Sequence, residues 1–552
     1  MFFDVFRSFL PLTNSLGFGP ADFIELALAA MLVLMALVWR AWLQPYALKL
    51  AERTGWSMLL LALLPVVLRL ALLAHHPVPS PDVYDEFGHL LEADTLRHFH
   101  LANPPHPLPQ FFETFFVLQE PAYSSIYPVG QGLALALGWA VFGLPWAGVL
   151  LSVAAFCALC YWMLRAWTTP GWALVGGVLA VIEFGPLSQW MNSYWGGALA
   201  AAAGCLVFGA LPRLRHGPRT RDAVLLGVGL GIHLLTRPYE SIFLFFAVVL
   251  FFVPDPRKLA RVAPDVILVL IPAVAMMLFQ NKAVTGSWTT LPEMLSQYQY
   301  GVPAALTFQS NPVPHRDLTR EQALDYKMQL SFHTGPETIT SYLERLEYRV
   351  RYYRFFFLPP LYLALAIFLV TIREFRFVWV AVTLLLFSLG VNFFPAFQLH
   401  YIAAVTCLFV LVSVTGLERI GGAATRLIVC LCIAHFLFWY GVHVFDDAEV
   451  SLAMRPYETW DAINHGNPER RIYVTRQLAR VPGKLLVFVR YYQQHIFQDE
   501  WVYNAADIDA ARVVWARDLG ETEDDKLRRY YPDRAVWLLE PDFRPPRLTP
   551  FE

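Results

Sequence analysis

The chain has 552 residues, of which 57% are hydrophobic and only 16% are charged. Soluble proteins carry nearer a quarter of charged residues, and the apolar residues here fall into runs of about 17–22, the length of a helix that crosses a bilayer. The net charge of −2 argues against a nucleic-acid partner. The composition therefore predicts an α-helical polytopic membrane protein.

The first two apolar runs, 22–43 and 56–73, are expected to be membrane helices. Arg40, Lys49 and Arg53 lie at and beyond the end of the first run, and the positive-inside rule assigns this basic loop to the cytoplasm. The chain after Leu73 should then be external, and a long external loop is expected over about 77–125.

The acidic part of this loop, Pro81 to Asp94, is predicted to form a helix. Asp82 is its expected N-cap, and Asp85 three residues later gives the spacing of a capping box. Apolar residues follow along one side, which predicts a helix that lies at the membrane interface. Carboxylates at a membrane surface are suited to act as a base or as metal ligands on a lipid-linked substrate.

The segment 126–142 is apolar but is interrupted by Pro128, Gly130 and Gly132. If it were a full span, the arginine cluster at 213–221 would be external, so we interpret it as a juxtamembrane or re-entrant segment. About twelve spans are expected in total, the others at about 146–165, 172–190, 193–211, 222–236, 239–253, 262–280, 356–372, 377–394, 401–418 and 425–442. A second external loop is expected over 281–355, with helical character from Arg320 to Arg354.

The composition changes near Val442, and the last part of the chain is polar. Short β-type runs at 485–489, 513–516 and 535–539 alternate with helical patterns, which predicts a small α/β fold. We therefore expect a membrane module over 1–442 and a small soluble C-terminal α/β domain over 443–552, on the external side.

Several residues of the external edge could carry chemistry. Asp85 could act as a general base, with Glu86 or His89 positioning that base or a metal. Asp82, Asp85, His89 and Glu92 share one helix face by their spacing, although a capped acidic interfacial helix would have the same pattern.

Arg237 lies between two short apolar segments, in Thr-Arg-Pro-Tyr-Glu. A charged residue at such a place indicates a functional site, and a guanidinium suits phosphate, although a simple pair with Glu240 could also explain it. His400 and Tyr401, at the outer end of a span, could meet a headgroup or a donor phosphate, or could be ordinary residues of the interfacial belt.

The order of these features resembles the GT-C superfamily of membrane glycosyltransferases, in particular the protein O-mannosyltransferases (glycosyltransferase family 39-like) and the lipid A aminoarabinose transferase. The resemblance lies in the segments DEFGHLLEADTL from Asp85, YPVGQGLALALGWAVFG followed by LPWAG, GLGIHLLTRP ending at Pro238, and the His400-Tyr401 pair. Together they cover about residues 80–410 in the order expected of that superfamily.

This resemblance implies an inverting glycosyltransferase that moves a hexosyl or pentosyl group from a polyprenyl-phosphate donor to a lipid, glycan or protein acceptor. Asp85 would match the catalytic carboxylate that activates the acceptor, and Arg237, His400, Tyr401 and His89 would bind the donor phosphate. The setting implied is a bacterial inner (cytoplasmic) membrane, with the site on the periplasmic or external side. The partners implied are the lipid-linked donor and membrane lipids.

Some members of the superfamily use a divalent metal, which would be Mg or Mn here, with Asp85 and Glu86 as candidate ligands. Members often carry a second acidic residue at the outer end of a later span, whereas this chain has Asn192 at the nearest position. A neutral amide is a poorer ligand for a hard cation, which puts metal dependence in doubt.

The sequence is also compatible with two other classes of membrane protein. A transporter or flippase of lipid-linked sugars would have similar spans, but it often shows internal repeats, and none is visible here. A polysaccharide polymerase or ligase would use arginines of the external loops, and Arg316, Arg320, Arg345, Arg349 and Arg351 provide them.

Overall fold

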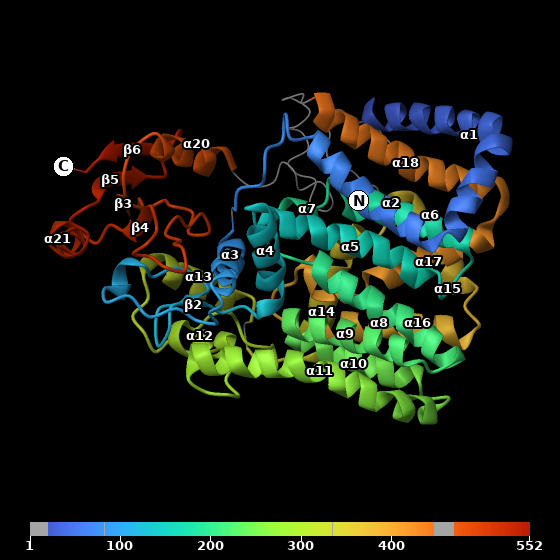
Figure 1. Cartoon of the computed structure of the whole chain (residues 1–552), viewed down its shortest axis with the longest axis horizontal. Coiled ribbons are helices and arrows are strands. Elements are labelled where there is room, and N and C mark those ends of the chain that lie inside the picture. The colour runs from blue at the N-terminus through green and yellow to red at the C-terminus, as the bar shows by residue number, and fades with distance from the viewer. Residues whose placement is uncertain (1–19, 82, 334, 446–467, 552) are drawn as a thin grey trace.

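The computed structural model describes residues 20–81, 83–333, 335–445 and 468–551. A body of long helices occupies one part of the molecule, and a small sheet lies at one end of it (Figure 1). The apolar helices show that this is an integral membrane protein. The helices of the body are α1 (Pro20–Glu52), α2 (Thr54–Ala71), α5 (Trp146–Leu164), α6 (Pro170–Phe184), α8 (Ala198–His216), α9 (Thr220–Thr236), α10 (Pro238–Phe251), α11 (Pro256–Thr285), α15 (Tyr362–Val370), α16 (Phe375–Val391), α17 (Thr406–Ile420) and α18 (Gly422–Phe445).

Among the described residues, six helices are long and apolar enough to cross a membrane, or up to eight if each of two bent helix pairs is one span. Four further apolar helices are shorter: α6, α10, α16 and α4 (Val129–Phe142). The predicted total of about twelve spans is therefore not confirmed and stays a prediction. The interrupted segment 126–142 became α4, which has 14 residues and runs across the direction of α5 and α8 (Figure 1).

Small residues let the helices of the body pack closely. A Cβ atom added at Gly138 of α4 would lie 2.1 Å from the backbone nitrogen of Gly148 in α5, and one at Gly204 of α8 would lie 1.8 Å from the carbonyl oxygen of Ala404. Ala404 belongs to the 3-10 segment η4 (Leu399–Val405). Side chains at these glycines would separate the backbones, so the small residues fix where η4 sits.

The acidic stretch forms α3 (Tyr84–Arg97), and its apolar side, which the sequence assigned to the membrane interface, packs on protein. Phe87 stacks on Tyr503 at 4.1 Å between ring centroids, and Leu91 and Ala93 are buried on two different sides, against the C-terminal sheet and against α4. The helix is thus enclosed by protein on both of these sides. Its capping box joins Glu86 to the backbone of Val83, and the predicted cap Asp82 lies outside the described residues.

The two predicted external loops contain short helices and strands. The first loop has η1 (Pro109–Phe111), β1 (Val117–Leu118) and β2 (Ser124–Ser125), and the short α7 (Gln189–Asn192) follows α6. The second loop has α12 (Pro292–Tyr300), α13 (Arg320–Ser331) and α14 (Ile339–Val350), followed by η2 (Arg351–Phe356) and η3 (Pro359–Leu361). The expected helical character from Arg320 to Arg354 is confirmed, although it is broken between α13 and α14.

The C-terminal segment forms a four-stranded sheet of order β4-β3-β5-β6, flanked by α20 (Pro468–Ala479) and α21 (Glu521–Tyr530). The strands are β3 (Leu485–Val489), β4 (Val513–Arg517), β5 (Ala535–Glu540) and β6 (Arg547–Pro550). Strand β3 pairs in parallel with β4 and β5, and β6 pairs antiparallel to β5. The three strands predicted from the sequence are confirmed. The domain boundary at 442/443 is not tested by the fold and stays a prediction.

One buried arginine joins the sheet to both loops. Arg517, at the end of β4, donates to Glu321 of α13 and to Glu500, each at 2.6 Å, and to the carbonyl oxygen of Glu113 in the first loop at 2.7 Å. Arg517 is only 5% exposed, and the two carboxylates keep it charged at any ordinary pH, because they raise its pKa. The network holds three segments together that are far apart in the sequence.

Replacement of Arg517 by Met should therefore destabilise the protein strongly, because Glu321 and Glu500 would be left buried without their cation. Losing one partner of a buried ion pair costs about 3–5 kcal/mol. The exposed pair of Lys526 with Glu523 offers a control, since Lys526→Met should cost about 0–1 kcal/mol. Thermal unfolding of the purified variants in detergent tests this, and equal unfolding temperatures would contradict it.

Candidate active site

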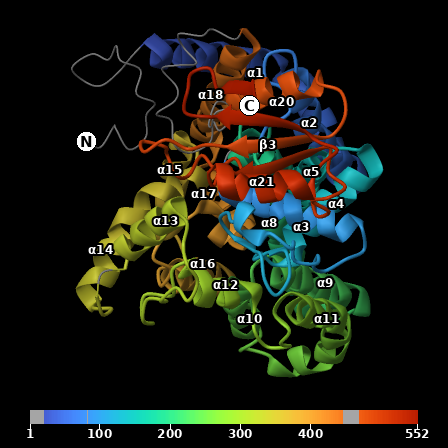
Figure 2. The same ribbon diagram turned by 90° about the vertical axis from the view of Figure 1, so that its left-hand side faces the viewer.

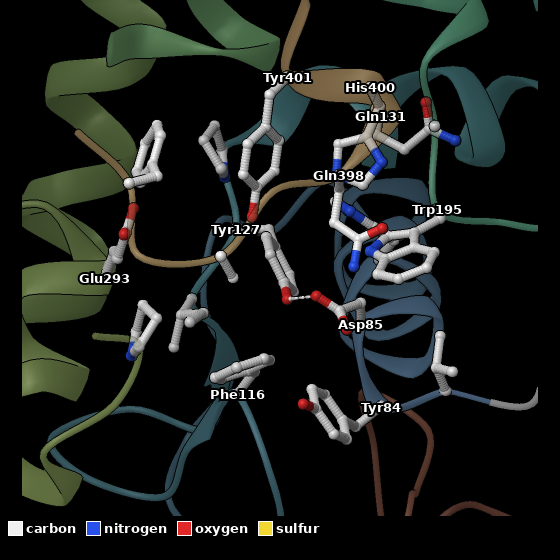
Figure 3. Close-up of a pocket in the computed structure, with 18 of the residues that line it drawn as sticks. Tyr84, Asp85, Phe116, Tyr127, Gln131, Trp195, Glu293, Gln398, His400 and Tyr401 are labelled. Carbon is white, nitrogen blue, oxygen red and sulfur yellow. Dashed lines mark hydrogen bonds between the residues drawn. The ribbon is translucent and has the colours of Figure 1, made fainter. Parts of the chain in front are cut away.

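A cavity of about 710 Å³ lies where the helical body meets the two loops and the C-terminal segment. Its walls come from the start of α3, the α9–α10 junction, η4, α11, α12 and α13, with further residues from the C-terminal segment. In Figure 3, Asp85, Trp195, Gln398 and His400 lie on one side, Glu293 lies opposite, and Tyr127 and Tyr401 stand between them. The cavity thus has a carboxylate on each side.

Five of the six predicted site residues meet in this cavity: Asp85, His89, Arg237, His400 and Tyr401. The sixth, Glu86, is not among the lining residues. Its carboxylate accepts hydrogen bonds from two backbone N–H groups, those of Tyr194 at 2.8 Å and Val83 at 3.2 Å. Glu86 therefore holds the start of α3 against the segment at 194, and Asp85 is the neighbour that faces the cavity.

Asp85 is held by two aromatic donors. The Tyr127 hydroxyl donates to its Oδ1 at 2.5 Å (Figure 3), and the Trp195 side chain is a second hydrogen-bond donor to it. Burial raises the pKa of the Asp85 carboxyl, while these two bonds and the charge of Arg237 lower it. The bonds orient the carboxylate and favour its ionised form, which is the form that accepts a proton.

Arg237 stands at the break between α9 and α10, where Pro238 begins the second helix. Its backbone is pinned: its N–H donates to the His233 carbonyl at 2.7 Å, and its own carbonyl accepts from the Ser241 hydroxyl at 2.8 Å. The guanidinium lies over the Tyr401 ring, 4.9 Å from the centroid. Its nearest approach to Glu240 is 4.0 Å, longer than a hydrogen bond, so that pair leaves donors of Arg237 for a ligand.

The two cavity histidines contact aromatic rings. His89 packs against Tyr127 with ring centroids 4.3 Å apart, and His400 packs against Trp195 at 5.2 Å. Burial and the charge of Arg237 lower the pKa of His89 to about 3. His89 is therefore neutral at physiological pH, and it can serve as a hydrogen-bond partner but not as a cation.

Sequence reasoning missed several cavity residues, because they come from the loops. Glu293 and Gln329 belong to the second loop, and Gln398 precedes η4. Behind Gln329 lies Asp325, fully buried, which accepts from the Gln329 amide at 2.9 Å. Burial and the nearby Asp85 raise the pKa of Asp325 to about 7. The only signal for Tyr127 was its place in the YPVGQG segment.

The predicted metal ligands do not form a metal site. Glu86 is occupied by backbone N–H groups, and no group of three or more His, Cys, Asp or Glu that could hold a metal occurs in the described part of the chain. Asn192, at the position where the superfamily often has an acid, accepts from Arg69 at 2.6 Å. A guanidinium at that position opposes a divalent cation. The donor set therefore does not fit Mg or Mn.

No protein-family model and no curated protein matches the sequence. The fold, by contrast, matches ArnT from Cupriavidus metallidurans. The apo state has a TM-score of 0.52 and 12% identity over 89% of this chain and 93% of that chain. The form bound to undecaprenyl phosphate has a TM-score of 0.52 and 11% identity over 88% of this chain and 93% of that chain. The chain thus has the fold of ArnT.

The Archaeoglobus fulgidus oligosaccharyltransferase in complex with Zn and sulfate is a weaker match. It has a TM-score of 0.46 and 12% identity over 88% of this chain and 67% of that chain.

The burial of Glu92 in α3 can be tested through the dependence of the protein's stability on pH. It is fully buried, it accepts from Gln280 at 3.3 Å, and burial raises its pKa from 4.5 to about 8. Between these two values the unfolded chain releases the proton and the folded chain keeps it, so Glu92 lowers the stability as the pH rises through this window.

Glu92→Gln should remove this loss, because the amide does not titrate. We expect the unfolding temperature of the wild type to fall from pH 5 to pH 8 more steeply than that of the variant. The exposed Glu344→Gln serves as the control and should keep the wild-type slope. Parallel slopes for Glu92→Gln and the wild type would contradict a raised pKa.

Proposed function

We propose that the protein is a glycosyltransferase that moves a sugar from a polyprenyl-phosphate donor to an acceptor on the external face of the membrane. The observation that carries this proposal is the meeting of Asp85, a carboxylate held by two donors, with Arg237, a cation with donors left for a ligand, in one cavity of a membrane protein. The ArnT fold supports it, since one ArnT structure is bound to undecaprenyl phosphate.

In the proposed reaction Asp85 acts as the general base. It takes the proton from an acceptor hydroxyl or amine while the acceptor atom attacks the anomeric carbon of the donor sugar. The bond between that carbon and the phosphate oxygen breaks on the opposite face, which inverts the configuration. Tyr127 and Trp195 keep the carboxylate in place, so little reorganisation is needed in the transition state.

The leaving group is a polyprenyl phosphate, and negative charge develops on it as the bond breaks. Arg237 stabilises that charge, because a guanidinium offers several donors in a fixed geometry. Tyr401 holds the Arg237 side chain from one face, and His400 and His89 offer neutral hydrogen-bond partners nearby. No step needs a metal. The transferred group is a hexosyl or pentosyl group, and the acceptor is a lipid, a glycan or a protein.

The proposed setting is a bacterial inner membrane, with the cavity and the C-terminal domain on the periplasmic or external side. A lipid-linked donor keeps its tail in the bilayer, so a base that acts on its sugar must lie at headgroup depth. The C-terminal segment adds Gln498, Asp499 and Arg544 to the cavity wall, which suits a part in covering the acceptor.

Arginines of the external loops were the reason to consider a polysaccharide polymerase or ligase. In the structure they bind residues of the protein itself. Arg316 pairs with Glu113 and Glu120, Arg345 with Glu337, and Arg320 donates to the carbonyls of Tyr492 and Gln493. None of the five lines the cavity. No observation favours a transporter over an enzyme.

Asp85→Asn should abolish transfer while the protein remains folded, because the amide keeps the shape but does not accept the proton. The measurement is transfer by the purified protein with several polyprenyl-phosphate sugars, beside a thermal unfolding curve. Removing a general base typically costs about 10²–10⁴-fold in rate. Full activity of the folded variant with any donor would contradict the role of Asp85 as the general base.

Arg237→Ala should mainly weaken the use of the donor, and the apparent KM for the polyprenyl-phosphate sugar should rise at least tenfold, since a hydrogen bond to a charged group contributes about 1.5–3 kcal/mol. The exposed Arg257→Ala is the matched control and should behave as the wild type. If the transfer rate of Arg237→Ala depended on donor concentration as that of the wild type does, Arg237 would not bind the donor phosphate.

A further inference from the structure

Helix α14 (Ile339–Val350) presents a strip of apolar side chains that no part of the described chain covers. Ile339 is 81% exposed, Leu343 is 55% exposed and Val350 is 64% exposed. At 100° per residue these three positions fall within a narrow sector of the helix, together with the half-buried Leu346. A strip of this kind in a soluble region would be unfavourable, so it calls for a partner.

A second strip beside the apolar one is acidic and exposed. Thr340, Glu344 and Glu347 follow each other along it, and helical geometry sets them roughly 40–100° around the axis from Leu343, all on the same side. The exposed half of α14 is therefore divided lengthwise into an apolar strip and a hydrophilic strip. This division is the pattern of a helix that lies in the boundary between lipid and water.

The remaining side of α14 is fastened to the end of α16. The Tyr342 hydroxyl donates to the carbonyl of Leu389 at 2.7 Å, Arg345 donates to that of Asn392 at 2.7 Å, and Arg349 donates to that of Val391 at 2.9 Å. These bonds decide which side faces the protein. The apolar strip and the acidic strip are left exposed. The helix itself lies at the periphery of the molecule (Figure 2).

The direction of α14 agrees with this pattern. The segment Ile339–Phe356 and the apolar segment Pro359–Val370 meet at an angle of 108°. A helix that leaves an apolar membrane helix at nearly a right angle runs along the membrane surface and not through it. The exposed Val382, Leu385 and Leu389 of α16 continue the apolar surface up to the place where Tyr342 docks.

From these observations we infer that α14 is an in-plane membrane helix whose apolar strip is covered by the lipid bilayer and whose acidic strip faces water. The bilayer is the occupant that fits, because the strip continues the lipid-facing surface of α16. Its position also bears on the cavity, since Arg349 donates to the carbonyls of Pro395 and Ala396, both at 3.2 Å, and both residues line the cavity. The cavity wall at 395–396 is thus held at the level of the lipid headgroups.

The test uses fluorescent labels on neighbouring positions of α14. All six native cysteines are buried, so a bimane label reacts with a single introduced cysteine. Leu343→Cys and Ile339→Cys report on the apolar strip, and the adjacent Glu344→Cys, with Glu347→Cys, is the matched control for the acidic strip. The full-length protein is placed in nanodiscs of phosphatidylcholine and phosphatidylglycerol. Quenching is compared for a lipid that carries a nitroxide high on its acyl chain and for iodide in the water.

We expect the lipid nitroxide to quench labels at Leu343 and Ile339 several-fold more than labels at Glu344 and Glu347, and iodide to show the reverse order. Equal quenching by iodide at Leu343 and Glu344 would overturn the inference, because the strip would face water. Protection of Leu343 from both quenchers would overturn it as well, because a second copy or another protein would then cover the strip. Neither outcome depends on the proposed glycosyl transfer.

Discussion

The buried ion network of Arg517 is the constraint on which the arrangement of the two loops and the C-terminal sheet depends. One guanidinium satisfies Glu321, Glu500 and the backbone at Glu113 at the same time. The C-terminal sheet, the second loop and the first loop are thereby joined at one point, and these are the segments that close the cavity over α3. A buried cation needs this many acceptors to offset its lost hydration. The same requirement favours this arrangement, because it places all three acceptors around one guanidinium.

The helical body supplies the other half of the site by close packing. Gly204 lets η4 lie against α8, which brings His400 and Tyr401 beside the α9–α10 break. There the backbone of Arg237 is bonded to His233 and Ser241, and its guanidinium lies over the Tyr401 ring. The cavity therefore has a rigid side made by the membrane helices, which carries Arg237, and a side made by α3 and the loops, which carries Asp85. Chemistry between a lipid-borne phosphate and a polar acceptor needs both sides.

Residues near α3 show where sequence reasoning reached its limit. Asp85 and Glu86 are adjacent and chemically alike, and spacing could not tell them apart. In the fold Glu86 binds two backbone N–H groups and Asp85 faces the cavity, because a helix turns successive side chains by 100°. The apolar side of α3 suggested an interfacial helix, but it packs on Tyr503 and the sheet. An apolar helix face shows that a partner exists, but it does not show whether that partner is lipid or protein.

The sequence by itself determined the membrane class, the helical body, three strands of the C-terminal sheet and five of the residues that line the cavity. These follow from local properties: the length of apolar runs, alternation along strands, and the cost of placing charges near a bilayer. Tertiary structure decided the rest, namely which carboxylate faces the cavity, the donors Tyr127 and Trp195, the loop residues Glu293 and Asp325, and the poor fit of a metal at Asn192. Those features depend on contacts between segments far apart in the chain, and no local pattern carries information about such contacts.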